Sequence, residues 1–192
     1  MTYISIDVET NGPCPGINSM LQIGAAAFDE EGQLLEDISY NLELLKGSVA
    51  DPKTMAWWLG KKDAYENTRF NIYHPQEAMG KFVAWVRKFP KPTALAYPAG
   101  FDFPWVYYYC HLLTGDCPFG FQCLDIKSYA AAILKVPYRE ATKKNMPHGW
   151  FVGLPKHTHD AADDAIEQGM LFFRMRKFGN YIDNSLNKTK GL

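Results

Sequence analysis

Three segments with the character of β-strands lie within the first 42 residues, and they constrain the fold more than any other feature. They are Tyr3–Glu9, Met20–Phe28 and Gln33–Leu42, which carry apolar or β-branched residues and are separated by turn-forming stretches. Because the connections are tight, we expect an antiparallel start to a β-sheet. The small residues 24–27 would let another backbone approach the second strand closely.

The rest of the chain alternates helical patterns with short strand-like stretches. Helices are expected from Pro52 through Trp58, from Pro75 to Phe89, and over residues 104–113, 128–134 and 160–178, with a strand over 93–96. This order indicates an α/β fold with a mixed β-sheet flanked by helices. We expect one domain over residues 1–180, followed by a polar, frayed tail over 181–192.

Composition agrees with a single folded domain. The 192 residues fit one domain of typical size, and an apolar content of 47% excludes a disordered chain. The net charge of −1 argues against a protein that coats duplex nucleic acid through bulk positive charge, but it is compatible with a local basic groove.

The sequence indicates neither a membrane span nor an export signal. The most apolar stretch, Phe103–Leu113, is far shorter than the roughly 18 residues that a span needs. No basic leader precedes an apolar run at the N-terminus. Cys14, Cys110, Cys117 and Cys123 form no C-x-x-C pair, so we expect reduced thiols and a cytoplasmic protein without membrane contact.

Asp7 and Glu9 stand two residues apart in the first expected strand, so both side chains leave the same face of the sheet. Neighbouring carboxylates repel each other unless a cation lies between them, and oxygen ligands of this kind suit Mg²⁺ or Mn²⁺. The alternative is a pair of strand-end residues that face solvent. The apolar run 4–6 disfavours that alternative, because it places the pair at the carboxyl end of a central strand, where ligand sites gather.

Asp102 follows a short expected strand and stands two residues before Pro104. A metal ligand and the N-cap of a proline-opened helix are equally good interpretations of this residue alone. The two roles are compatible only if a free carboxylate oxygen faces the site.

His159 and Asp164 lie at the start of the last expected helix. Five residues correspond to about 140° around a helix, so the two side chains would not share a face. A histidine on the preceding loop can instead lean over a pocket whose wall carries Asp164. The buried stripe of the helix favours Asp164 over Asp163 as a ligand, while a capping or solvent-facing role is the alternative for His159.

In this order, Asp7-Val8-Glu9-Thr10, Phe101-Asp102 and His159-x4-Asp164 resemble the DEDDh subgroup of the DnaQ-like (RNase T, proofreading) 3′→5′ exonucleases. The resemblance covers Tyr3 to about Phe178 and is strongest to small stand-alone bacterial, plasmid or phage members. It includes Gln22-Ile23-Gly24-Ala25, where the family commonly has an acidic residue before Ile-Gly. One departure is Pro98, which stands where the family often has asparagine.

The resemblance implies a ribonuclease H-like fold and two-metal hydrolysis of phosphodiester bonds, with release of nucleoside 5′-monophosphates. Asp7 would bridge two Mg²⁺ or Mn²⁺ ions, Glu9 and Asp164 would hold the first ion, and Asp102 would bind through water. His159 would take the proton from the attacking water. Small proteins of this type are often dimers, so a homodimer is one expected state.

The substrate implied by the resemblance is the 3′ end of single-stranded nucleic acid, either RNA or DNA. Contacts are expected from Thr10, Met20 and Leu21. The stretch 135–156 carries five basic residues against Glu140 alone, which fits either a phosphate-binding wall or a solvated loop. Of Trp57 and Trp58, one could stack on a base, although burial against a neighbouring helix is favoured for either.

Two other functions fit parts of the pattern. A non-catalytic nucleic-acid-binding module could share the fold, but it would not need all four carboxylates and the histidine. A zinc hydrolase could use His157 and His159, but no third imidazole or thiolate is spaced to join them.

Overall fold

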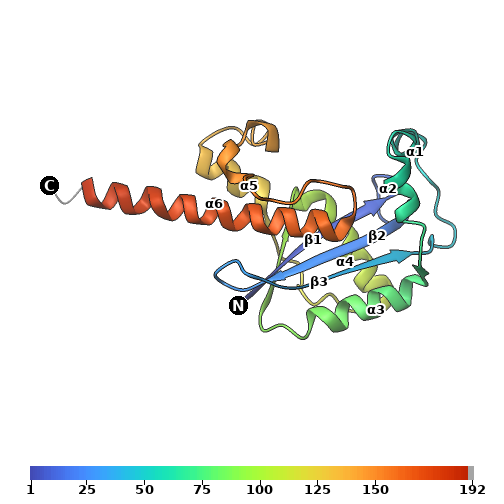
Figure 1. The fold of residues 1–192 in the computed structure, drawn as a ribbon. Helices are drawn as coiled ribbons and strands as arrows, with labels where there is room; N and C mark the ends of the chain where they lie inside the picture. Colours follow the sequence, from blue (N-terminus) through green and yellow to red (C-terminus); the bar gives the residue numbers. More distant parts are fainter. Residues whose placement is uncertain (190–192) are drawn as a thin grey trace.

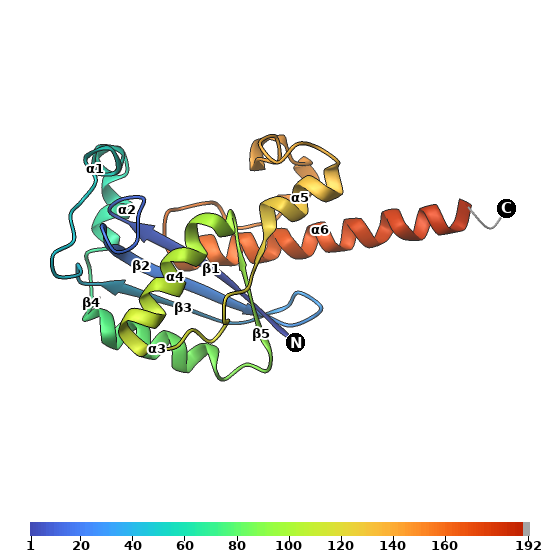
Figure 2. The ribbon, with the colours of Figure 1, turned by 180° about the vertical axis from the view of Figure 1, so that it is seen from behind.

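The structure, a computed structural model that describes residues 1–189, contains a six-stranded mixed β-sheet with helices on both faces (Figures 1 and 2). The strands are β1 (Thr2–Thr10), β2 (Met20–Phe28), β3 (Leu34–Leu42), β4 (Ile72–Tyr73), β5 (Pro92–Ala96) and β6 (Cys123–Asp125), in the order β4-β3-β2-β1-β5-β6. β1, β2 and β3 pair antiparallel, whereas β4, β5 and β6 join the sheet in parallel. The antiparallel start and the α/β class are thus confirmed.

Helices cover the two faces of the sheet unequally. They are α1 (Pro52–Leu59), α2 (Lys62–Asn67), α3 (Pro75–Val86), α4 (Ala99–Thr114), α5 (Ile126–Leu134) and α6 (Ala161–Thr189), with 3-10 turns over Lys143–Asn145 and His148–Trp150. α3 and α4 pack on one face, and α6 crosses β1, β2 and β3 on the other (Figures 1 and 2). α1 and α2 lie beyond the carboxyl end of β1.

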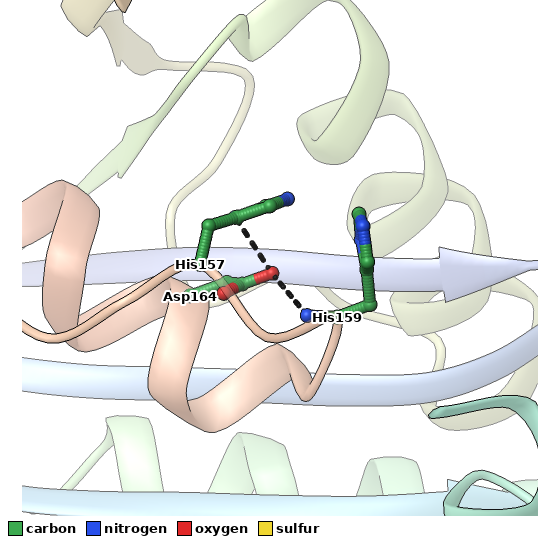
Figure 3. Close-up of side chains that lie close together, drawn as sticks. All are labelled: His157, His159 and Asp164. Carbon is green, nitrogen blue, oxygen red and sulfur yellow. Dashed lines mark hydrogen bonds and ion pairs between the residues drawn. The ribbon is translucent and has the colours of Figure 1, made fainter. Parts of the chain in front are cut away.

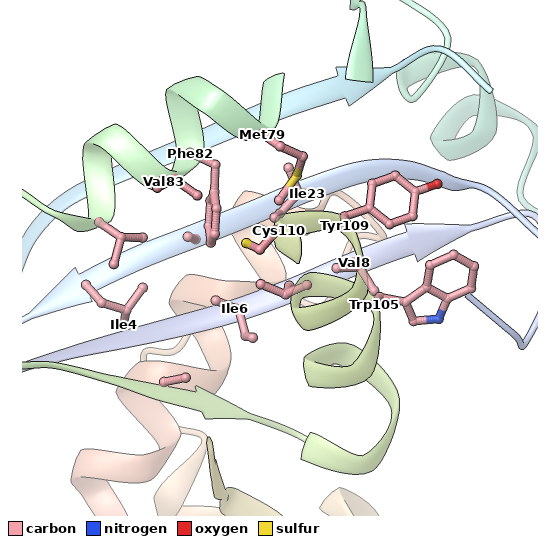
Figure 4. Close-up of a cluster of buried hydrophobic side chains, with 14 of the residues drawn as sticks. Ile4, Ile6, Val8, Ile23, Met79, Phe82, Val83, Trp105, Tyr109 and Cys110 are labelled. Carbon is pink, nitrogen blue, oxygen red and sulfur yellow. The ribbon is translucent and has the colours of Figure 1, made fainter. Parts of the chain in front are cut away.

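The alternation of side chains along β1 separates the main core from the candidate site. Ile4, Ile6 and Val8 face α3 and α4 and pack into a buried apolar cluster with side chains of those helices (Figure 4). Because successive side chains point to opposite faces, Asp7 and Glu9 face α6 instead. Both acidic residues are buried.

Gly24 allows α6 to approach the sheet at backbone distance. A β-carbon at this position would lie 2.0 Å from the carbonyl carbon of Ala161. Beside it, the Gln22 side chain accepts the Ala161 N–H at 2.9 Å and donates to Asp160 at 3.1 Å. The close approach expected at residues 24–27 is therefore confirmed, and it fixes the start of α6 on β2.

Several expected helix boundaries are wrong: α3 ends at Val86 rather than Phe89, and α5 begins at Ile126 rather than at residue 128. α4 begins at Ala99, so Asp102 lies inside the first turn and is not its N-cap. The Ala99 N–H is capped by the Asp125 side chain at 3.0 Å, a long-range contact that local sequence signals do not show. α6 continues past Phe178 to Thr189; of the expected tail, residues 190–192 lie outside the described residues.

The described residues bear on two expectations, one about membrane spans and one about the thiols. Among residues 1–189, no helix has both the length and the apolar character that a membrane crossing requires. All four cysteines are free thiols.

Candidate active site

β1 and α6 run antiparallel across the same face of the sheet, and this arrangement assembles the site. At one end, the Tyr3 ring packs against Phe173 at a centroid distance of 5.4 Å. Further along, Gln168 donates a hydrogen bond to Asp7. The carboxylates of Asp7, Glu9 and Asp164 then meet, with one oxygen of each within 4.8 Å of the others. The sequence-predicted ligands Asp7, Glu9 and Asp164 therefore lie together.

Asp102 lies beside this group on α4. Its Oδ1 accepts the backbone N–H of Val8, between Asp7 and Glu9, at 3.3 Å. Asp102 is buried, and its charge raises the pKa of Asp7. The fourth carboxylate is thus at the site but outside the three-residue group. Pro98 directly precedes α4, whose first N–H donates to Asp125.

The electrostatics of the cluster favour neutralisation by a cation. Burial raises the pKa of the Asp7 carboxyl well above its ordinary value, and the charges of Asp102, Glu9 and Asp164 raise it further. Burial also raises the pKa of Glu9, and it raises the pKa of Asp102 to about 8. Hard oxygen donors crowded in a buried space fit a divalent cation such as Mg²⁺ or Mn²⁺.

His159 lies on the loop that leads into α6, as the separation from Asp164 predicts. The backbone N–H groups of Thr158 and His159 donate to the two Asp164 oxygens at 2.9 and 3.1 Å. This turn holds His159 at φ +61°, a left-handed conformation that non-glycine residues seldom adopt. Its Nδ1 lies 3.7 Å from Oε1 of Glu9. The loop therefore aims the imidazole at the carboxylates.

Trp57 and Trp58 have different environments. Trp58 is buried, and its indole N–H donates to the carbonyl of Thr10 at 2.9 Å, which ties α1 to the end of β1. Trp57 is 45% exposed and packs edge-on against the His159 ring at a centroid distance of 4.9 Å. The burial favoured for both tryptophans is correct for Trp58 and wrong for Trp57, whose neighbour is the site itself.

Two polar side chains of α6 at the site were missed in the sequence. Gln168 stands four residues after Asp164 on the same helix face, a spacing that could have revealed it. Glu167 is buried and forms an ion pair with Lys143 from the basic stretch. The positive charge of Lys143 also lowers the pKa of Asp102. Lys143 is thus the basic residue of that stretch whose charge acts on the carboxylates.

His157 also lies at the site, with its Nδ1 2.9 Å from Oδ2 of Asp164 (Figure 3). The expected substrate contacts are less open. Met20 and Leu21 are fully buried, and Thr10 is buried with its hydroxyl donating to Gly12 at 2.8 Å. Their contacts with substrate stay predictions.

Comparisons with known proteins agree with this arrangement. Residues 2–174 match the family described as the 3′-5′ exoribonuclease Rv2179c-like domain. The 3′-5′ DNA exonuclease Cap18 of Escherichia coli is 31% identical over 180 residues, which cover 88% of this chain and 89% of Cap18.

Solved structures share the fold. The nuclease domain of 3′hExo, a DEDDh family member bound to rAMP, has a TM-score of 0.72 at 12% identity, over 93% of this chain and 92% of that one. The zinc-bound complex of E. coli ExoI with single-stranded DNA has a TM-score of 0.69 at 16% identity and matches 97% of this chain. The match covers 43% of ExoI, so this chain spans less than half of that protein.

Fold and family together define a 3′-5′ exonuclease with the ribonuclease H-like architecture of the DEDDh enzymes. More specifically, the chain belongs to the Rv2179c-like 3′-5′ exoribonuclease domain family.

Proposed function

We propose that this exonuclease uses two divalent cations to remove nucleoside 5′-monophosphates from the 3′ end of single-stranded nucleic acid. The observation that carries the proposal is the meeting of the Asp7, Glu9 and Asp164 carboxylates within 4.8 Å. Residues 1–180 would form the single exonuclease domain. The free thiols favour the cytoplasm, and a homodimer stays a prediction.

The four carboxylates would hold Mg²⁺ or Mn²⁺. Asp7 lies centrally and would bridge the two cations, Glu9 and Asp164 would hold one of them, and Asp102 would bind through water. When bound, such cations activate a water molecule and stabilise the charge on the leaving 3′ oxygen. Gln168 would keep Asp7 oriented, because its side-chain N–H donates to Oδ1 of that carboxylate.

His159 would act as the general base. Its Nδ1 faces Glu9, which orients the ring and leaves Nε2 to accept a proton from water. The hydrogen bonds between the loop backbone and Asp164 keep the imidazole beside the ligands. The base and a metal ligand are therefore positioned by a single turn of the chain.

The terminal nucleotides would lie between Trp57 and Lys143. Half-exposed Trp57 offers a ring face for a base, and Lys143 offers a cation for a phosphate. Thr10, Met20 and Leu21 stay the predicted contacts of the last nucleotide, at the end of β1 and the start of β2, although all three are buried. The family description specifies an exoribonuclease, whereas Cap18 is a DNA exonuclease, so both RNA and DNA are candidate substrates.

A single set of digestions tests the proposal. Matched 5′-labelled single-stranded RNA, single-stranded DNA and a duplex with a 3′ overhang are incubated with Mg²⁺ or with EDTA. We expect stepwise shortening from the 3′ end with Mg²⁺ and none with EDTA. Binding without shortening under both conditions would instead favour the non-catalytic binding module.

A further inference from the structure

His157 is not one of the five predicted catalytic residues, yet it contacts one of them, Asp164. One donor atom each from His157, His159 and Asp164 lie within 4.8 Å of one another (Figure 3). We propose that these three residues form a second metal site, selective for Zn²⁺, whose occupation blocks the exonuclease. The blocking effect rests on the proposed function, whereas the binding of zinc does not.

The distance between the His157 and Asp164 donors is close to that in a zinc site, and the His159 donor lies within 4.8 Å of both. Bonds of about 2.0 Å at tetrahedral angles place neighbouring ligand atoms roughly 3.3 Å apart. Nδ1 of His157 lies 2.9 Å from Oδ2 of Asp164. A cation would therefore need to separate this pair only slightly.

The surroundings hold Asp164 in place and leave room for a further ligand. Its two oxygens accept the Thr158 and His159 N–H groups, which occupies part of the acceptor capacity of the carboxylate and leaves lone pairs for a metal. The His157 side chain is 46% exposed, so solvent can reach the site. Water, or Glu9 from beside His159, would complete a tetrahedron.

The two sites differ in the cations that they prefer. Asp7, Glu9 and Asp164 offer only oxygen, which suits Mg²⁺ or Mn²⁺, whereas two imidazoles and one carboxylate suit Zn²⁺. Asp164 belongs to both sets, so zinc on the histidines would compete for its oxygens with a cation of the carboxylate site. Zinc on the histidines would also occupy the imidazole of His159 and prevent it from accepting a proton.

Zinc binding is measured directly on the metal-free full chain by calorimetry. The variant His157→Asn removes one ligand, and His148→Asn is the matched control, since His148 is exposed on the same connecting segment and outside the cluster. Loss of an outer partner of a metal ligand alone costs about 10–100-fold in affinity. We therefore expect zinc to bind His157→Asn at least about tenfold more weakly, and the control to bind like the wild type.

Two further readouts separate zinc binding from activity. X-ray absorption at the zinc edge of the wild-type protein should show two imidazole ligands, and this requires no variant to fold. In Mg²⁺, added Zn²⁺ should inhibit the wild type and His148→Asn at lower concentrations than His157→Asn, each relative to its own zinc-free rate. Equal zinc affinity of His157→Asn and wild type, or absorption with oxygen ligands only, would overturn the proposal. Absence of any Mg²⁺-dependent cleavage would count against the proposed function and leave the zinc site standing.

Discussion

Gln168 donates its side-chain N–H to Oδ1 of Asp7 at 2.6 Å, while its own Oε1 is buried and has no hydrogen-bond partner among the described residues. An unpaired buried carbonyl lowers the free energy of unfolding, so the position of this amide is unfavourable for stability alone. The arrangement fits a positioning residue, whose N–H orients the Asp7 carboxylate.

Replacing Gln168 with leucine should weaken metal binding more than the chemistry. The half-saturating Mg²⁺ concentration should rise about 10–100-fold, the usual effect of losing an outer partner of a ligand, while the rate at saturating Mg²⁺ recovers. Mg²⁺ titrations of nucleotide release measure this. The control is Gln76→Leu on the exposed face of α3. Identical Mg²⁺ curves for Gln168→Leu and wild type would show that Asp7 needs no such support.

Asp7→Asn should abolish turnover and leave the fold intact. Loss of the carboxylate proposed to hold both cations would remove several kcal/mol of transition-state stabilisation, which is at least about 10³-fold in rate. Because burial and like charges raise the pKa of Asp7, the neutral amide should not lower the melting temperature of the metal-free chain. Near-full activity of Asp7→Asn would show that the site is misassigned.

The stability of the metal-free protein should fall as the pH rises from about 4 towards about 8. The pKa of Asp102 is about 8 in the folded chain, against an ordinary value of 3.8. A raised carboxyl pKa means that the folded state retains a proton which the unfolded state has lost, so each pH increase in this window favours unfolding.

Melting in EDTA at about pH 6 and about pH 8 checks this prediction. We expect the lower melting temperature at the higher pH, a smaller difference in Asp102→Asn, and a larger stabilisation by Mg²⁺ at the higher pH. A melting temperature that rises with pH in EDTA would contradict it.

Lys143→Ala should weaken substrate binding. Hydrogen bonds to charged groups contribute about 1.5–3 kcal/mol, so kcat/KM should fall by about tenfold or more. The removal also leaves Glu167 buried without its cation, so melting is recorded in parallel. The adjacent exposed Lys144 provides the matched control. An equal effect of Lys144→Ala would indicate general charge rather than a specific contact.

Trp57→Ala should raise KM for single strands. Stacking on an aromatic ring contributes about 1–3 kcal/mol per base, which corresponds to roughly 5- to 150-fold. Phe121 is the control, since it is 80% exposed near the amino end of β6, away from the carboxyl end of β1. If both alanine variants keep the wild-type KM, the terminal base lies elsewhere.

Sequence reasoning succeeded where the signal is local or repeated. The boundaries of β2 and the Asp51 cap of α1, whose side chain accepts the Thr54 N–H at 2.8 Å, follow from neighbouring residues alone. The candidate ligands follow from spaced motifs in a fixed order that resemble a family, and three of them lie close together in the structure. Asp7 and Glu9 share a face because side chains two residues apart on one strand point to the same side of the sheet.

Contacts between distant segments could not be predicted in this way. The start of α4 depends on Asp125, which stands 26 residues further along the chain. No third imidazole or thiolate is spaced to join His157 and His159 in the sequence, whereas the fold brings the carboxylate of Asp164 within 4.8 Å of both. The ion pair between Lys143 and Glu167 likewise joins segments that stand 24 residues apart.

The geometry of the candidate active site depends on Gly24, a residue that has no side chain to bind a cation or a substrate. The helix that presents Asp164 rests on bare backbone there, and even one methyl group would collide with Ala161. A larger residue would lift that helix and widen the span between the carboxylates of strand and helix, although every ligand would still be present. A substitution at Gly24 should therefore lower the exonuclease activity, although Gly24 is not among the proposed contacts of cation or substrate. A sequence comparison limited to the predicted catalytic residues would not reveal this effect.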